Sequence, residues 1–172
     1  SLKYSTSKFS DDHIATIRFF RLFGLDSEKD VKPVWVVASK PARKSLLGKY
    51  IDFMIDNTLI FRGYVGEEKP LKVLTYIWDG PVTKLDAKAP LLKEATGKDF
   101  VSATYRGFMT KKGVPADRLA KLRDSFEKAM KDPECIKEME KRGIPHGYVD
   151  GAGTEKLTYE FQEYCNEFFK KQ

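Results

Sequence analysis

The chain is poor in the residue types that carry most catalytic and metal chemistry. Among 172 residues there are two cysteines and two histidines. His13 and His146 have no partners at metal-ligand spacing, and Cys135 and Cys165 do not form a C-x-x-C motif. The sequence therefore predicts no metal site and no cofactor. For the two cysteines, a disulfide formed in an oxidising compartment remains an alternative to two buried thiols on apolar faces, which the pattern favours.

A catalytic nucleophile has little support in the sequence. Ser10 and His13 lie one helical turn apart, but no G-x-S-x-G turn and no orienting acid accompany them. We therefore predict that the chain is not an enzyme, and keep a small α/β enzyme or regulatory domain as the alternative.

Long apolar runs and blocks of like charge are absent as well. No stretch approaches the roughly 20 apolar residues that a transmembrane helix needs. Lysine and arginine number 31 against 25 aspartates and glutamates, but these charges are interspersed along the chain. The pattern favours an ordinary solvated surface over a nucleic-acid footprint, so we predict no nucleic-acid partner. A mildly positive field would favour an anionic solute.

What is present is an alternation of strand-like and helix-like segments. Ser10 is a suitable N-cap for a core helix that runs through Phe23 and is closed by Gly24. Short apolar runs rich in β-branched residues predict strands at residues 2–4, 34–37, 51–55, 71–78 and 100–109, and glycine-ended segments predict helices at 41–47 and 90–96. This order predicts an α/β fold with a mostly parallel sheet, in which ligands bind beyond the carboxyl ends of the strands.

The most specific pattern lies near residue 110. A glycine-proline loop at residues 110–115 leads into an amphipathic helix at 117–131, because Pro115 and Asp117 both suit a first helical turn. Pro133 separates this helix from a second one at 134–142, and Thr154 is the expected cap of a terminal helix. The predicted buried stripe of the first helix is Leu119, Leu122, Phe126, Ala129 and Met130.

The series GVPADRLAKLRDSFEKAMKDPE resembles the extracytoplasmic solute-binding receptors of the tripartite tricarboxylate transport family. The resemblance implies a type II periplasmic-binding-protein-like lobe, a periplasmic or extracytoplasmic location, a small carboxylate as solute and membrane transporter subunits as partners. It assigns residues 1–109 to the second ligand-binding domain and residues 110–172 to C-terminal helices. We expect a first domain to precede this chain in the intact receptor. The C-terminal helices would pack on that domain, so here their apolar residues are either exposed or buried against a second copy, and the second arrangement would make a homodimer.

Three loops after predicted strands resemble ligand loops of that family. Residues 5–10 resemble its serine- and glycine-rich loop, whose hydroxyls and backbone amides bind the solute. Residues 38–41 resemble its YKGGAPA turn, and Asp56 with Asn57 matches its G-x-x-D-x-x-x-D-N run, whose acid and amide face the cleft. The residues of each loop are equally well explained as helix caps and turn formers.

Arg106 is the last candidate, because a guanidinium there could bind a carboxylate through two hydrogen bonds, or equally pair with a neighbouring acid. Since half of the donors would come from the other domain, we predict weak solute binding by this chain alone. The candidate ligand-binding residues are Ser5, Thr6, Ser7, Ser10, Ala38, Ser39, Asp56, Asn57 and Arg106.

Overall fold

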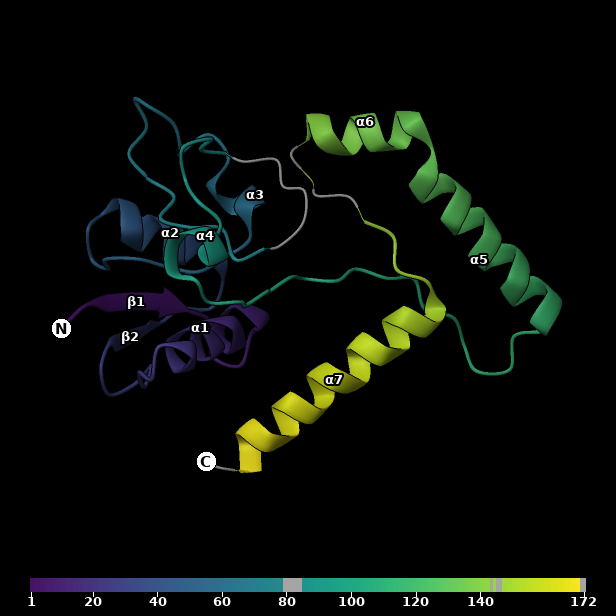
Figure 1. Ribbon diagram of the computed structural model, residues 1–172, viewed down its shortest axis with the longest axis horizontal. Helices are drawn as coiled ribbons and strands as arrows, with labels where there is room; N and C mark the ends of the chain where they lie inside the picture. The colour runs from purple at the N-terminus through teal and green to yellow at the C-terminus, as the bar shows by residue number, and fades with distance from the viewer. Residues whose placement is uncertain (79–84, 143, 145–146, 171–172) are drawn as a thin grey trace. The chain divides into compact units, whose positions relative to one another are not determined.

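The computed structural model describes residues 1–78, 85–142, 144 and 147–170, with side chains described as far as residue 166. The chain forms two compact units, Ser1–Arg106 and Gly107–Gln172 (Figure 1). The first unit contains the strands, and the second contains helices α5 to α7. None of the described helices is long and apolar enough to cross a membrane.

The first unit begins with a β-α-β arrangement. Strands β1 (Lys3–Thr6) and β2 (Lys32–Trp35) pair in parallel, with Ser5 opposite Val34. Helix α1 (Asp11–Leu22) connects them, as predicted. It begins there because the Ser10 side chain accepts a hydrogen bond from the backbone N–H of His13 at 3.2 Å. Two parallel strands joined by a helix place their carboxyl ends at one edge of the sheet.

A third segment extends this sheet on the other side of β1. Tyr4 forms an isolated parallel bridge with Phe53, and the Asp52 amide donates to the Lys3 carbonyl at 2.9 Å. The predicted strand at 51–55 is therefore reduced to one bridge. The strand-like segment still runs parallel to β1, so its carboxyl end lies at the same edge as those of β1 and β2.

Two other predicted strands are wrong. Residues 71–78 contain only isolated bridges, which pair Val65 with Leu71 and Tyr76 with Leu91, and residues 100–109 form no strand. Apolar runs mark segments that can pair, but a ladder also needs a partner over several residues, and among the described residues only β1 and β2 have one. The parallel sheet predicted for the α/β fold is present in a shorter form.

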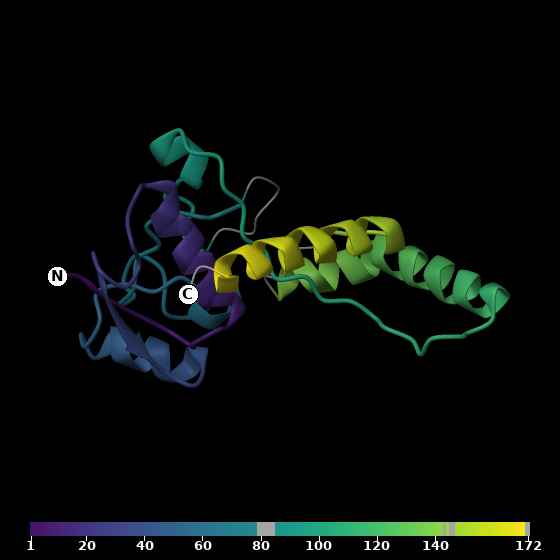
Figure 2. The same cartoon turned by 90° about the horizontal axis from the view of Figure 1, so that it is seen from below.

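Three further helices lie in the described part of the first unit. Helix α2 (Ser39–Leu47) starts two residues before the predicted position, and α4 (Leu92–Thr96) ends at a left-handed Gly97 with φ 70°. A short helix that the pattern missed, α3 (Thr58–Phe61), follows Asn57, whose side chain accepts from the Leu59 amide at 2.9 Å. In Figure 2, α1 and α2 lie on opposite sides of the strand pair, so both faces of the small sheet are covered.

The core of this unit is aromatic. Tyr4 is fully buried and lies 6.0 Å from Phe20 and 5.8 Å from Phe53 between ring centroids. Val31 completes the buried cluster. Because Tyr4 belongs to β1 and Phe20 to α1, this cluster fixes the helix against the strand and thereby positions the loop between them.

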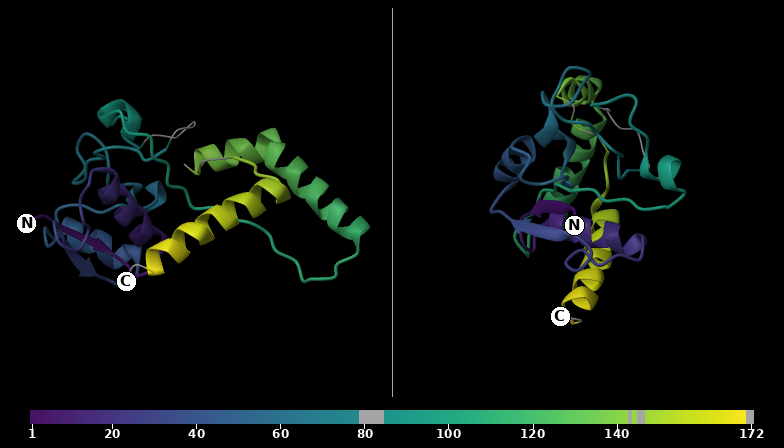
Figure 3. Two further views of the ribbon diagram at one scale, coloured as in Figure 1. Left: turned by 60° about the horizontal axis from the view of Figure 1, so that its bottom comes forward. Right: turned by 90° about the vertical axis from the view of Figure 1, so that its left-hand side faces the viewer.

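The second unit consists of α5 (Ala116–Lys131), α6 (Pro133–Lys141) and α7 (Gly151–Lys170). Helices α5 and α6 meet at an angle at Asp132, as Figure 3 shows, and the Asp132 carboxylate caps α6 by accepting from the amides of Glu134 and Cys135. The predicted break is confirmed. The predicted closing residue of α6, Gly143, lies outside the described residues.

Two expectations for these helices are wrong. Thr154 lies inside α7, and Asp150 precedes the helix instead, accepting from the Gly153 amide at 2.7 Å. The apolar stripe of α5 is not buried, since Leu122 is 52% exposed and Phe126 only half-buried. Among the described residues of this unit, no side chain is buried.

Candidate functional site

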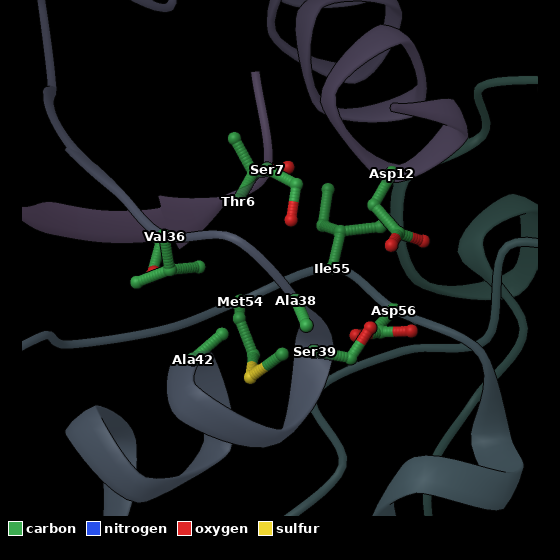
Figure 4. Close-up of a pocket in the computed structure, with 11 residues that line it drawn as sticks. Thr6, Ser7, Asp12, Val36, Ala38, Ser39, Ala42, Met54, Ile55 and Asp56 are labelled. Carbon is green, nitrogen blue, oxygen red and sulfur yellow. The ribbon is translucent and has the colours of Figure 1, made fainter. Parts of the chain in front are cut away.

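A small pocket lies where the three parallel segments end. Its empty volume is about 170 Å³, including solvent at its opening. Figure 4 shows side chains that line it, which come from the loops after β1 and β2, from the segment after Phe53 and from the first turns of α1 and α2. The lining residues are Ser5, Thr6, Ser7, Asp12, Val36, Ala38, Ser39, Ala42, Met54, Ile55 and Asp56.

The loop after β1 supplies three hydroxyl side chains. The Ser5 hydroxyl donates to the Val34 carbonyl at 2.9 Å and so holds β1 to β2. Thr6 is 3% exposed, and its hydroxyl has no hydrogen-bond partner among the described residues. Ser7 is half-buried, and its carbonyl accepts from the Ser10 hydroxyl at 2.8 Å. Thr6 therefore has a buried hydroxyl whose hydrogen bond is not made within the described part of the chain.

The loop after β2 leads directly into α2. The Val36 amide donates to the Thr6 carbonyl at 3.2 Å, which keeps this loop beside the end of β1. Ala38 has an extended backbone, with φ −167°, and makes no side-chain cap for the helix. The amides of the first turn of α2 therefore have no side-chain partner at the cap position, and such amides favour an anionic group.

Asp56 reaches the pocket from the third segment. Its carboxylate accepts from the Asn57 amide at 2.7 Å. Burial raises the pKa of Asp56 above its usual range, and hydrogen bonds from the Ser39 hydroxyl and the Asn57 amide partly offset this rise. In Figure 4 the Ser39 side chain lies next to that of Asp56. Ser39 therefore links α2 to the third segment.

Asp12 is a pocket residue that the sequence reasoning missed. Burial, together with the nearby carboxyl groups of Asp56 and Asp11, raises the pKa of Asp12 to about 7. No hydrogen-bond donor reaches this carboxyl group from the described part of the chain. A signal for it existed: Asp12 lies one helical turn before the buried residues Ala15 and Thr16, which places it on the buried face of α1.

Six of the nine predicted ligand residues line this pocket, and three do not. Ser10 and Asn57 cap α1 and α3, which is the structural role that the sequence left open for them. Arg106 is exposed and is not among the described residues that line the pocket. The six that come together are Ser5, Thr6, Ser7, Ala38, Ser39 and Asp56.

His13 does not face Ser10 as a general base. Its Nδ1 accepts from the Phe9 amide at 3.1 Å, and its ring packs edge-on against Trp35 at 4.9 Å between centroids. Burial lowers the pKa of His13, which favours the neutral form of the ring. The other histidine, His146, lies outside the described residues. His13 thus serves as a packing residue behind the loop that follows β1.

The two cysteines, Cys135 and Cys165, are half-buried, and they form no disulfide in the described part of the chain. Cys135 lies on α6, and Cys165 lies on α7. In the described part of the chain, no three His, Cys, Asp or Glu side chains are grouped as metal ligands.

No protein-family model and no curated protein sequence matches the chain. Among solved structures, the chain is similar to a TctC solute-binding protein from Polaromonas without ligand, with a TM-score of 0.77 and 19% identity over 100% of this chain and 58% of that one. It is also similar to an R. palustris protein with adipate, with a TM-score of 0.74 and 17% identity over 96% of this chain and 54% of that one.

The chain has a periplasmic-binding-protein fold. This confirms the predicted fold class, an α/β lobe with a parallel sheet and flanking helices. The chain spans little more than half the length of the two proteins it matches. Within this fold, the pocket occupies the position at which open α/β sheets bind their ligands, the edge formed by the carboxyl ends of the strands.

Proposed function

We propose that the chain is a ligand-binding lobe of a solute receptor that captures a small carboxylate and passes it to the membrane subunits of a tripartite tricarboxylate-type transporter. The observation that carries this proposal is the meeting of the unpartnered Thr6 hydroxyl and the uncapped first turn of α2 in one pocket. Hydroxyls and first-turn amides are donors, and a carboxylate accepts hydrogen bonds only.

The comparisons add support from the fold and from one ligand. One similar protein is a TctC solute-binding protein, and the other was solved with adipate, a dicarboxylate. The proposal makes the chain a binding protein and not an enzyme, with an extracytoplasmic location. The proposed ligand residues are the hydroxyl and amide donors of Thr6, Ser7, Ala38 and Ser39, and their solute would also contact the other lobe of an intact receptor.

Titration of adipate into isotope-labelled chain, followed by the amide resonances, tests this proposal. We expect shifts that saturate in the millimolar range, because the donors of one lobe alone bind weakly. The shifts should be confined to residues 6–7, 36–39 and 56–57, and hexanediol, which has the same carbon chain without the carboxylates, should give none. Adipate shifts that are absent from these residues, or that fall only in the second unit, would exclude a carboxylate site in this pocket.

A further inference from the structure

The pocket presents two kinds of polar group on different sides. Figure 4 shows the side chains of Thr6 and Ser7 at the end of β1, and on another side the carboxyl groups of Asp12, at α1, and of Asp56, next to Ser39. None of the described lining residues is lysine, arginine or histidine. A purely anionic solute would therefore approach two acidic side chains with no basic side chain in the lining to compensate them.

Two of these groups lack a partner in the folded chain. No donor from the described residues reaches the Asp12 carboxyl group, which is half-buried. The Thr6 hydroxyl is also unpartnered, and Thr6 is 3% exposed. A buried polar group without a hydrogen bond costs free energy, so both groups gain when a ligand supplies one. The unpartnered Thr6 hydroxyl is evidence for a ligand that does not depend on the acidic pair.

The charges around the pair do not neutralise it. Asp11 on α1 adds a further negative charge near Asp12 and contributes to the pKa of about 7. The cation that acts on Asp56 is Arg43 of α2, but its guanidinium already donates to the Ile60 carbonyl and lies 4.4 Å from the centroid of the Tyr64 ring. The carboxyl side of the pocket therefore favours a ligand group that is positively charged and donates hydrogen bonds.

We propose that the solute carries a protonated amino group beside its carboxylate, as an α-amino acid does, and that Asp12 and Asp56 bind the amino group while Thr6 and Ser7 donate to the carboxylate. This inference rests on the proposed function and specifies its solute. An ammonium group has three N–H donors, which suits two acceptor carboxylates. The pocket opens to solvent at this edge of the sheet, so only the head group of such a solute would contact these side chains and the remainder would extend beyond this lobe.

The test compares adipate with aminoadipate, which differs from it by one α-amino group. Both are titrated into the labelled chain at about pH 8, where solute ammonium and carboxylate groups are ionised. We expect aminoadipate to bind about tenfold more tightly than adipate, through the same pocket amides. Equal affinity, or tighter binding of adipate, would overturn the inference while leaving the carboxylate site intact. If neither compound shifts these amides, the proposed function fails with it.

The variant Asp12→Asn identifies the group responsible. It should reduce aminoadipate affinity about tenfold and leave adipate binding unchanged or stronger, because it removes a negative charge from the pocket. Asp11→Asn is the matched control: it removes the same charge from the same helical turn, but Asp11 binds the Thr104 hydroxyl outside the pocket. We expect less than about a twofold change in that variant.

Titration of adipate at several pH values distinguishes this model from an alternative one. In the alternative, a protonated Asp12 donates a hydrogen bond to a carboxylate of the solute. In that alternative, adipate affinity rises as the pH falls below about 7, and Asp12→Asn abolishes the pH dependence. Observation of this pattern, with no preference for aminoadipate, would overturn the inference. A preference for aminoadipate that Asp12→Asn removes and Asp11→Asn preserves would support it.

Discussion

The two compact units of the chain stabilise their helices in different ways. In the first unit, α1 buries Ile14, Ile17 and Phe20, and Phe20 packs in the core cluster with Tyr4 of β1. In the second, no described side chain is buried, although α5 and α7 are longer than α1. Burial of apolar surface supplies most of the stability of a helix in a folded protein. The comparison therefore predicts a first unit held by its core and a second held mainly by caps and surface pairs.

The surface pairs of the second unit are numerous but weak. Lys128 pairs with Asp124 at 2.8 Å and Lys131 with Glu127 at 2.6 Å, both one helical turn apart on α5 and both largely exposed. Exposed pairs of this spacing contribute about 0.3–0.5 kcal/mol each. They favour helix in the segment without fixing it against another element.

Replacement of one phenylalanine by alanine in each unit gives the strongest test of this difference in burial. Phe20→Ala should lower the free energy of unfolding by about 3–5 kcal/mol, because Phe20 is 6% exposed and packs on Tyr4 and Phe53. Phe126→Ala in α5 should cost about 1 kcal/mol or less, since Phe126 is only half-buried beside Phe108 and Tyr148. Urea denaturation followed by circular dichroism measures both. Equal losses in the two variants would mean that the second unit has a core of its own.

The difference between the units also explains which elements the sequence predicts. Helices α1 and α6 were predicted closely because their signals are local: Ser10 and Asp132 cap them, and Gly24 follows α1 with φ 73°. Strands depend on partners that are distant in the sequence. The segments at 51–55 and 71–78 have suitable side chains but only single bridges, and no local pattern states how long a ladder will be.

The site was predicted in part for the same reason. The hydroxyls after β1 and the acid after the Phe53 segment follow predicted strand ends, and parallel pairing brings such ends together. Asp12 was missed because an acid in the first turn of a helix is ordinarily explained by the helix dipole. Its raised pKa depends in part on the third segment, which brings the Asp56 carboxyl group near it from 44 positions along the chain (56 − 12 = 44).

The half-buried acids of the pocket should lower the free energy of unfolding of the first unit near neutral pH. The pKa of Asp12 rises from 3.8 to about 7 on folding, so the folded chain binds more protons than the unfolded chain between these values. Stability should therefore fall as the pH rises from about 4 to 7, and the raised pKa of Asp56 acts in the same direction. The second unit has no described acid with a resolved shift, so it should add little to this slope.

Asp12→Asn should remove most of this pH dependence and stabilise the chain by about 1–2 kcal/mol near pH 8. The full shift corresponds to about 4 kcal/mol, but Asp12 is partly exposed and the amides of the first turn of α1 stabilise its charged form. Urea unfolding at several pH values measures the effect, with Asp11→Asn as the charge-matched control. A flat stability profile in the unchanged protein would show that the Asp12 carboxyl group is solvated.

The smallest effect is expected at a cap of the second unit. Asp132→Ala should cost about 1 kcal/mol, because the Asp132 carboxylate accepts from the amides of Glu134 and Cys135 at 2.9 and 3.0 Å. Asp117→Ala is the matched control in the first turn of α5, where the cap residue is Pro115 and no side chain makes a capping bond, and it should cost a few tenths of a kcal/mol.

Hydrogen exchange of the α6 amides is the sensitive measurement for the variants Asp132→Ala and Asp117→Ala. If the second unit is held mainly by its caps, Asp132→Ala should raise exchange throughout α6 and leave α1 unchanged, since no buried core couples the described helices of this unit. Faster exchange in α1 would show that the two units unfold together. Their helices would then share one cooperative transition, and the contrast in burial between them would not determine how the chain opens.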